Sequence, residues 1–372
     1  MTFAPLRVGI DATPLLGQRT GIGRYVEHLL QGLLTNDHLD VVATAFSLRG
    51  LGALPAAVPD GVKTFARPFP ANLAQRLWMR GELFTVDRVS GLHARVFHGT
   101  NFVLPPQRPE RSGVLTIHDL AYLRLPQTVD AVSQRFRTLV PRGLQRAEIV
   151  VTPSRATADD VIDAYDLSPD RLVVTPLGVE PAWLSTTPPD ADWRAAHGIP
   201  SSYLLAVGRM EPRKGLDVLL DAYRVLQDRG IDEPLVVCGP PGWGPALDRA
   251  GIRADRVIET GWLDTDALRP LVAGASCLVF PSRYEGFGLP PLEALACGTA
   301  VVASDLAVTR EVLGVHARYA AVEDVEALAD AIARTLSDGG PTRSAARREH
   351  AATFTWAACA AATATAYERA AS

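Results

Sequence analysis

Short apolar segments rich in valine, isoleucine and leucine alternate with amphipathic stretches of helical periodicity along most of this chain. In the first half, such segments predict strands at 7–12, 41–46, 62–67, 95–100, 114–120, 148–154 and 172–178. Strands that alternate regularly with helices form parallel sheets, and those helices cover both faces. The sequence therefore predicts an α/β fold.

The same pattern starts again after a segment rich in proline, threonine and aspartate at 185–192. Further strands are predicted at 203–208, 235–239, 256–263, 277–281 and 300–304. A chain of 372 residues is long enough for two domains, each with its own core. We therefore expect two α/β domains.

The composition excludes several classes of protein. A net charge of −4 with a charged fraction of 21% does not give the broad basic surface that general nucleic-acid binding requires. No stretch approaches the ~20 apolar residues of a membrane span. The cysteines form no C-x-x-C pair and fit a reducing compartment; they are Cys238, Cys277, Cys297 and Cys359. We expect a cytoplasmic protein that is soluble or peripheral to the membrane.

The segment 281–298 is the most informative part of the chain. It follows an apolar strand and contains Glu285, two glycines at Gly286 and Gly288, a pair of prolines, and Glu293. The glycines let the backbone turn tightly, and proline is favoured in the first turn of a helix. A helix N-terminus with free N–H groups attracts phosphate, so we expect Glu285 in the loop and Glu293 in the first turn to flank an anion site.

Two cations follow the first strand predicted for the second domain. Arg209 and Lys214 lie in the run 206–216, and Lys214 is one of only two lysines in the chain. A guanidinium fork and a movable ammonium group can together hold a diphosphate and offset the charge on a departing one. The alternative is a set of surface bases near a turn, and we expect Arg213 to be solvated.

A glycine loop also follows the first strand, at 19–25. Gly21 and Gly23 permit a close approach of the backbone to a ligand, but Val26 stands where the dinucleotide pattern G-x-G-x-x-G needs its third glycine. This disfavours an NAD enzyme. A purely structural glycine turn is the alternative.

Histidines end two other strands of the first domain. His118 lies in the stretch 116–120, where it can donate to a sugar hydroxyl or handle protons near neutral pH, with Asp119 beside it to orient the loop. A satisfied structural histidine is the alternative. His98 can line an acceptor site, although a turn after a strand needs no function.

These motifs resemble those of the retaining family 4 glycosyltransferases. The E-x7-E spacing of Glu285 and Glu293, the run G-R-x-x-x-x-K-G that holds Arg209 and Lys214, the glycine loop at 19–25 and the His-Asp-Leu sequence at His118 occur in the family's order. The resemblance implies the GT-B fold, in which two Rossmann-like domains with parallel sheets face each other across a cleft. The segment 175–179 resembles the family's crossing between domains, which places the hinge near residues 177–180 and the domains at 1–178 and 179–354. The resemblance also implies that the C-terminal helix, 355–372, packs back on the N-terminal domain.

The resemblance assigns roles to individual residues. Glu285 would lie near the transferred hexose and Glu293 would bind the ribose hydroxyls, while Arg209 and Lys214 hold the diphosphate. The remaining donor contacts would come from Gly21, Gly23, His118, Trp262, Leu263, Gly286, Phe287, Gly288 and Leu289. Plain core packing is the alternative for Trp262.

The implied activity is transfer of a hexose from a nucleotide sugar to a glycan or lipid-linked acceptor of the cell envelope, at the inner face of the membrane. We favour mannose from GDP-mannose, departure and attack on one face of the sugar, and no metal ion or other cofactor. The alternatives are a non-catalytic nucleotide-sugar-binding partner subunit and a GT-B nucleotide-sugar epimerase. The segment 71–95 has the pattern of a helix that either touches lipid or acceptor, or packs on its own domain.

Overall fold

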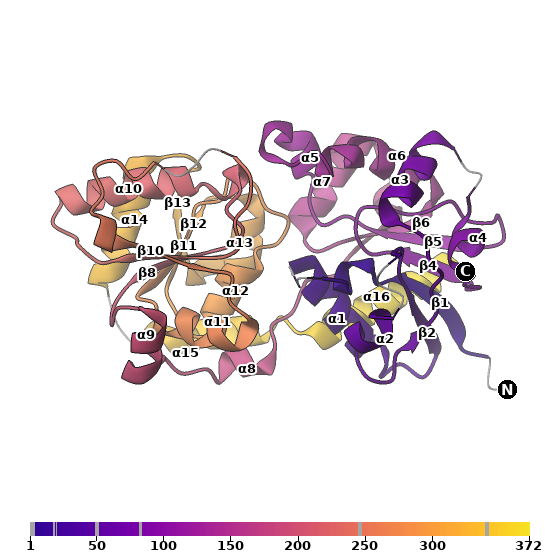
Figure 1. Cartoon of the computed structure of the whole chain (residues 1–372), viewed down its shortest axis with the longest axis horizontal. Coiled ribbons are helices and arrows are strands. Elements are labelled where there is room, and N and C mark those ends of the chain that lie inside the picture. The colour runs from indigo at the N-terminus through magenta and orange to yellow at the C-terminus, as the bar shows by residue number, and fades with distance from the viewer. Residues whose placement is uncertain are drawn as a thin grey trace. The chain divides into compact units, whose positions relative to one another are not determined.

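The computed structural model describes residues 4–17, 19, 21–48, 52–81, 84–244, 248–338 and 342–372, with the backbone alone for 342 and 343. The chain divides into two compact units (Figure 1). The first unit comprises Met1–Leu123, Ala131–Gly178 and Thr355–Ser372, and the second comprises Arg124–Asp130 and Val179–Phe354.

The first unit is built on a seven-stranded sheet in the order β3-β2-β1-β4-β5-β6-β7, and all the neighbouring strands run parallel. Its central strands are buried on both faces, which explains why the sequence shows continuous apolar runs there. The strands are β1 (Leu6–Asp11), β2 (Leu39–Thr44), β3 (Lys63–Thr64), β4 (Val96–Gly99), β5 (Ser112–Thr116), β6 (Ala147–Thr152) and β7 (Leu172–Val174).

Two layers of helices enclose this sheet (Figure 1). Helices α1 and α16 lie together on one face, and α3 and α6 lie together on the other. The helices of this part of the chain are α1 (Gly21–Leu33), α2 (Leu54–Ala57), α3 (Ala71–Arg80), α4 (Val86–Ser90), α5 (Ala121–Arg124), α6 (Phe136–Arg146), α7 (Arg155–Tyr165) and α16 (Trp356–Ala371). Short 3-10 turns occur at Thr13–Leu15, Pro126–Thr128, Ser133–Arg135 and Pro169–Arg171.

The C-terminal helix α16 is part of the first unit. It begins after Thr355, whose hydroxyl accepts a hydrogen bond from the third N–H of the helix. The ring of Trp356 stacks on His28 of α1 with 4.7 Å between the ring centres, and the thiol of Cys359 donates to the carbonyl of Thr175. Contacts at both helix termini and at the sheet therefore hold α16 in place.

The second unit contains a six-stranded sheet in the order β10-β9-β8-β11-β12-β13, again with parallel neighbours. Helices α10 and α14 pack together on one face, where they form an apolar core with the strands, and α12 packs with α11 and α15 on the other (Figure 1). The strands are β8 (Leu204–Val207), β9 (Leu235–Cys238), β10 (Val257–Gly261), β11 (Cys277–Phe280), β12 (Val301–Ser304) and β13 (Arg318–Ala320).

The helices of the second unit connect these strands or follow them. They are α8 (Pro181–Leu184), α9 (Ala191–His197), α10 (Leu216–Asp228), α11 (Thr265–Gly274), α12 (Leu289–Ala296), α13 (Ala307–Leu313), α14 (Val325–Ser337) and α15 (Thr342–Ala352). Short 3-10 turns occur at Pro212–Lys214, Ala254–Arg256 and Gly314–His316. No helix in the described ranges combines the length and the apolar character that crossing a bilayer needs.

The predicted α/β fold with parallel sheets is confirmed, and each strand segment predicted from the sequence overlaps an observed strand. The prediction at 114–120 extends too far, because Ile117 and Leu120 belong to a buried loop and are as apolar as strand residues. Strand β13 was not predicted, because its residues, Arg318-Tyr319-Ala320, include no valine, isoleucine or leucine, the residues that mark the predicted segments.

Candidate functional site

The loops that follow β8 and β11 meet at one edge of the second sheet. The two strands are parallel neighbours, so their carboxyl ends point to the same side. The N–H of Arg283 donates to the carbonyl of Arg213 at 2.8 Å. Gly215 has a φ of +64°, and a Cβ there would lie 2.1 Å from the carbonyl oxygen of Pro281. The two loops can approach this closely only because residue 215 is glycine.

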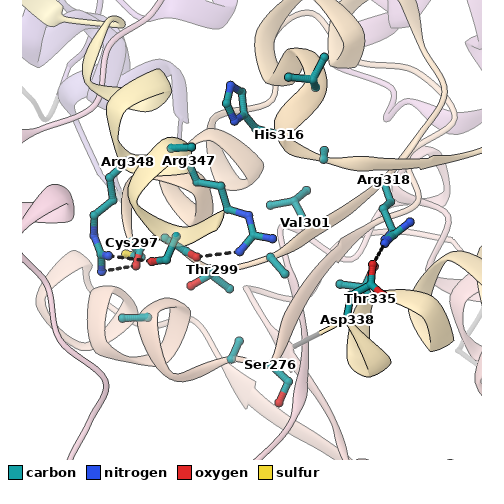
Figure 2. A pocket seen from close by; sticks show the side chains of 18 of the residues that line it. Ser276, Cys297, Thr299, Val301, His316, Arg318, Thr335, Asp338, Arg347 and Arg348 are labelled. Carbon is teal, nitrogen blue, oxygen red and sulfur yellow. Dashed lines mark hydrogen bonds and ion pairs between the residues drawn. The ribbon is translucent and has the colours of Figure 1, made fainter. Parts of the chain in front are cut away.

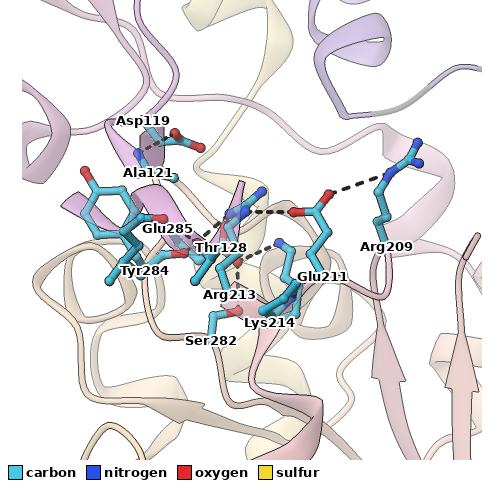
Figure 3. Close-up of polar contacts among 12 residues, drawn as sticks. Asp119, Ala121, Thr128, Arg209, Glu211, Arg213, Lys214, Ser282, Tyr284 and Glu285 are labelled. Carbon is cyan, nitrogen blue, oxygen red and sulfur yellow. Dashed lines mark hydrogen bonds and ion pairs between the residues drawn. The ribbon is translucent and has the colours of Figure 1, made fainter. Parts of the chain in front are cut away.

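A network of charged side chains connects these loops (Figure 3). The Lys214 ammonium donates to Oε1 of Glu285 at 2.6 Å, and the Ser282 hydroxyl donates to the same oxygen at 2.8 Å. The Arg213 guanidinium donates to Oε2 of Glu285 at 3.2 Å. Both oxygens of the Glu285 carboxylate are therefore engaged by donors.

Burial strengthens the electrostatic attraction between the charged groups of this network. The Lys214 and Glu285 side chains are 15% and 7% exposed. Burial by itself raises the pKa of the Glu285 carboxyl, but Lys214 and Arg213 outweigh it and hold that pKa below its usual value. Burial and the nearby Arg213 lower the pKa of Lys214, and Glu285 opposes this shift. Glu285 is therefore ionised at neutral pH.

Arg209 joins the same network at its outer end. The Arg213 guanidinium donates to Oε2 of Glu211 at 2.9 Å, and Nε of Arg209 lies 3.7 Å from Oε1 of Glu211 (Figure 3). The Arg209 side chain is 34% exposed, more than any other member of this chain of charges. The two cations predicted from the sequence thus belong to one network and are separated by Glu211 and Arg213.

The expectation that Arg213 is solvated was wrong. Its side chain is 17% exposed and bridges Glu211 and Glu285. Glu211 and Ser282 were also missed. Each contacts a residue of its own loop, Arg213 and Glu285 respectively, and its place in the site follows only because Arg213 bonds to Glu285, 72 residues away. The sequence does contain one signal for Glu211 and Arg213, namely their proximity to Lys214 in a single short loop.

The predicted turn and helix after Glu285 are confirmed. Gly288 has a φ of +93° and precedes α12, and a proline occupies the first turn of that helix. Glu293 is only 2% exposed. The sequence predicted Glu293 in the first turn of α12. It is instead the fifth residue of the helix, beyond the first turn, because the helix begins at Leu289.

Four further predicted donor contacts differ in what their side chains can offer. Phe287 and Leu289 are buried, and the ring of Phe287 meets that of Phe354 edge-on with 6.1 Å between the ring centres. Such side chains serve packing and leave only their backbone groups for a ligand. Trp262, directly after β10, is 48% exposed, so core packing is not its role, while the adjacent Leu263 is partly buried.

His118 lies in the first unit, in the loop after β5. Its Nε2 is 2.8 Å from the carbonyl oxygen of Thr100, and because a carbonyl only accepts, this nitrogen carries the hydrogen. Burial lowers the pKa of His118, although the Thr100 carbonyl and Asp119 oppose the shift. Neutral His118 therefore offers Nδ1 as an acceptor. Asp119 accepts from the N–H of Ala121 at 2.9 Å and so orients the loop.

The other residues predicted in the first unit differ in their surroundings, and a Cβ at Gly21 would meet open space. Gly21 begins α1, and a Cβ at Gly23 would lie 3.0 Å from the carbonyl oxygen of Pro14, so Gly23 permits close packing within the unit. Thr20 of the same loop lies outside the described residues. His98 is fully buried and does not line a site.

His98 instead belongs to a buried hydrogen-bonded chain. Its Nδ1 lies 2.7 Å from the hydroxyl of Tyr367 on α16, and its Nε2 lies 2.6 Å from the hydroxyl of Thr116. The Thr116 hydroxyl also lies 3.1 Å from that of Tyr25, whose ring contacts His118 edge-on. Within the described part of the chain, no group of three or more His, Cys, Asp or Glu side chains is placed to hold a metal ion.

Comparison with known proteins identifies the family. A model described as Glycosyltransferase Family 4 matches residues 19–183, and one described as Glycosyl transferases group 1 matches residues 201–338. The chain is 28% identical to the O-antigen chain mannosyltransferase B of Escherichia coli over 390 residues, which cover 98% of this chain and 100% of that protein. It is 33% identical to a D-inositol 3-phosphate glycosyltransferase of Salinispora arenicola over 272 residues, 65% of this chain and 60% of the other.

A solved structure gives the same fold. The sucrose-phosphate synthase of Thermosynechococcus elongatus superposes with a TM-score of 0.71 at 20% sequence identity, over 98% of both chains. The shared fold is that of GT-B glycosyltransferases, and this chain shows it as two α/β units with parallel sheets. Taken together, the two family models, the relative matched over its full length and the shared fold show that this chain belongs to the family 4 glycosyltransferases.

Proposed function

We propose that this glycosyltransferase moves a mannosyl residue from GDP-mannose to a glycan or lipid-linked acceptor of the cell envelope, with retention at the anomeric carbon. The observation that carries the proposal is the buried network of Lys214, Arg213 and Glu285 at the carboxyl edge of the second sheet. The mannosyl donor rests on the relative that matches along its full length, which is a mannosyltransferase.

The cations of the network fit a departing nucleoside diphosphate. As the bond between the anomeric carbon and the phosphate oxygen breaks, its electron pair stays with the β-phosphate, whose negative charge grows. Lys214 and the more exposed Arg209 would bind this phosphate and stabilise that charge. Because these side chains supply the positive charge, the reaction we propose needs no metal ion and no other cofactor.

Glu285 acts in this proposal as a sugar-binding group. Its two oxygens already accept from Lys214, Ser282 and Arg213, and its lowered pKa makes it a poor general acid. A carboxylate held in this way is also a poor nucleophile, which disfavours a covalent glycosyl intermediate. The acceptor oxygen would then attack the face from which the phosphate leaves, and its proton would pass to that phosphate.

We assign His118 a role in holding a sugar hydroxyl. With Nε2–H bonded to the Thr100 carbonyl and the pKa lowered by burial, the ring presents Nδ1 as an acceptor near neutral pH. It would accept a hydrogen bond from the sugar and would take no part in proton transfer.

We further propose action at the cytoplasmic face of the membrane, with peripheral contact through α3. The apolar side of this helix packs on its own unit, where Trp78 is buried, but Leu73, Arg76 and Arg80 are exposed and the helix has no acidic residue. Arginines beside an apolar side chain suit an anionic lipid surface. Co-sedimentation with vesicles containing anionic lipid should fall in an Arg76→Gln, Arg80→Gln double variant. Unchanged co-sedimentation would contradict this contact.

The central experiment measures turnover of nucleotide sugars by the purified chain. Slow release of GDP from GDP-mannose should exceed release from UDP-glucose, persist in EDTA and fall at least about a hundredfold in Lys214→Ala, the loss typical of removing one donor to developing charge. The matched control is Lys63→Ala, which removes the chain's other lysine. NMR of the product with an added acceptor should show the anomeric configuration of the donor. Conversion of the donor to another nucleotide sugar, without release of GDP, would point to an epimerase instead.

A further inference from the structure

A pocket lies at the amino edge of the second sheet, away from the network of charged side chains at its carboxyl edge. Its walls include Ser276 just before β11, Val301 at the start of β12 and Arg318 at the start of β13 (Figure 2). Its volume of about 580 Å³ is within the usual range for small-molecule sites. Neither the motifs nor the proposed reaction uses this pocket.

The lining of the pocket is positively charged. It contains three arginines, Arg318, Arg347 and Arg348, and a single aspartate, Asp338 (Figure 2). His316 also lines the pocket, and burial, the neighbouring His350 and Arg347 lower its pKa. The excess of arginine over aspartate in this lining favours an anionic ligand.

Two of the arginines are held in place by the end of α12. Arg347 donates to the carbonyl oxygen of Gly298 at 3.1 Å, and Arg348 donates to that of Cys297. Arg348 also donates to the hydroxyl of Ser344 at 3.0 Å. These bonds satisfy carbonyls at a helix C-terminus and fix both guanidinium groups before any ligand arrives.

The glycine after α12 keeps this part of the pocket tightly packed. Gly298 has a φ of +78°, and a Cβ there would lie 2.0 Å from the Ser344 hydroxyl and 2.7 Å from the guanidinium of Arg348. Any side chain at this position would push the arginine aside. The backbone conformation of Gly298 and the position of the Arg348 side chain therefore depend on each other.

Arg318 is the arginine most able to change partners. It pairs with Asp338 at the mouth of the pocket, and the two side chains are 32% and 52% exposed. Such an exposed ion pair contributes little to stability, so a ligand anion can replace the aspartate at small cost.

We propose that this pocket binds a phosphorylated small molecule of the size of a sugar phosphate or a mononucleotide. Three arginines can balance the charge of a phosphate monoester, and each guanidinium group can donate two parallel hydrogen bonds to phosphate oxygens. The pocket is larger than inorganic phosphate needs, and Ser276, Thr299 and Val301 provide polar and apolar surface for the rest of the molecule. The proposal does not depend on the donor or acceptor proposed above.

Calorimetric titration of the full chain tests the site with four probes: mannose 6-phosphate, adenosine monophosphate, inorganic phosphate and mannose. At least one of the two organic phosphates should bind more tightly than inorganic phosphate, and mannose should not bind. Arg318→Gln should weaken binding about tenfold or more, the usual effect of losing a charged hydrogen bond. Asp338→Asn should strengthen binding, because it removes the competing carboxylate.

Two controls separate this site from others in the chain. Arg310→Gln removes another exposed arginine paired with an aspartate, Asp305, that does not line the pocket, and it should leave binding unchanged. Lys214→Ala should leave binding unchanged as well, whereas it should abolish binding of GDP. A probe lost in Lys214→Ala and kept in Arg318→Gln binds at the other edge of the sheet, and that result overturns the proposal.

NMR of the histidine side chains gives a readout that a purely structural role for the arginines would not change. A bound phosphate should raise the pKa of His316, with the signal assigned by its loss in His316→Gln, and mannose should not. Absence of binding by both organic phosphates up to about 10 mM, a concentration equivalent to roughly −3 kcal/mol, would refute the site. Equally tight binding of inorganic phosphate would refute the class of ligand.

Discussion

The two lysines of the chain form ion pairs of the same length in different surroundings. Lys63 lies 2.6 Å from the Asp40 carboxylate, with side chains 70% and 18% exposed. Lys214 lies 2.6 Å from Glu285, with side chains 15% and 7% exposed. Replacing each lysine by methionine keeps most of the side-chain volume and removes the charge, so the pair of variants isolates the effect of burial.

The expected losses differ several-fold. An exposed pair contributes ~0.2–1 kcal/mol, and the exposure of Lys63 places it in this class. Removing one partner of a fully buried pair costs ~3–5 kcal/mol. In Lys214→Met, Arg213 and Ser282 still bond to Glu285, so we expect a smaller loss, about 2 kcal/mol, near the value of one charged hydrogen bond.

The free energy of unfolding of both variants is measured by urea denaturation followed by hydrogen exchange of individual peptides, because this method reports the stability of each unit separately. Lys214→Met should destabilise the second unit by about 2 kcal/mol, and Lys63→Met should destabilise the first by under ~1 kcal/mol. A double-mutant cycle with Glu285→Gln should give a coupling of at least ~1 kcal/mol. Equal losses in the two lysine variants, or additive effects in the cycle, would refute the argument from burial.

Three further changes test other parts of the structure. Burial lowers the pKa of His98 from 6.5 to about 3. The stability that neutral His98 contributes above pH 6.5 should therefore be lost as the pH falls toward 3, by up to about 1.4 kcal/mol per pH unit. In urea denaturation of the first unit, His98→Gln should flatten this dependence on pH. Gly215→Ala should cost about 2 kcal/mol or more in the second unit, because φ is +64° and the new Cβ would overlap the Pro281 carbonyl; a loss under ~1 kcal/mol would show that the loops can separate. Thr355→Ala removes the N-cap of α16 and should cost ~1 kcal/mol, with faster hydrogen exchange at the start of that helix, whereas Thr355→Ser should keep the stability.

The sequence was sufficient to predict the fold and the loops at the carboxyl edge of the second sheet. Strand positions followed from continuous apolar runs, because parallel strands are buried on both faces, and the start of α12 followed from glycine and proline. These are local signals, carried by neighbours in the chain. Strand β13, which includes no valine, isoleucine or leucine, lacks such a signal.

Contacts between distant segments determine the rest of the site. The sequence gives Arg213 no role, yet it bridges Glu211 in its own loop and Glu285 in a loop 72 residues away. Both histidines lie near the carboxyl end of a strand, His98 within β4 and His118 in the loop after β5, but His98 bonds to Tyr367 of the last helix and is structural. Spacing along the chain cannot distinguish the two histidines, because the difference lies in what packs against them.

The scarcity of lysine is the clearest case of a signal that needs the structure to interpret it. Rarity draws attention to Lys214, but it applies equally to Lys63, which also pairs with a carboxylate at 2.6 Å. The difference is that the loops after β8 and β11 close over Lys214 and leave Lys63 exposed on a two-residue edge strand. A diphosphate that approaches Lys214 meets a cation already stripped of most of its water, where electrostatic attraction is strong. Burial therefore distinguishes Lys214, the lysine that we propose binds the diphosphate, from Lys63.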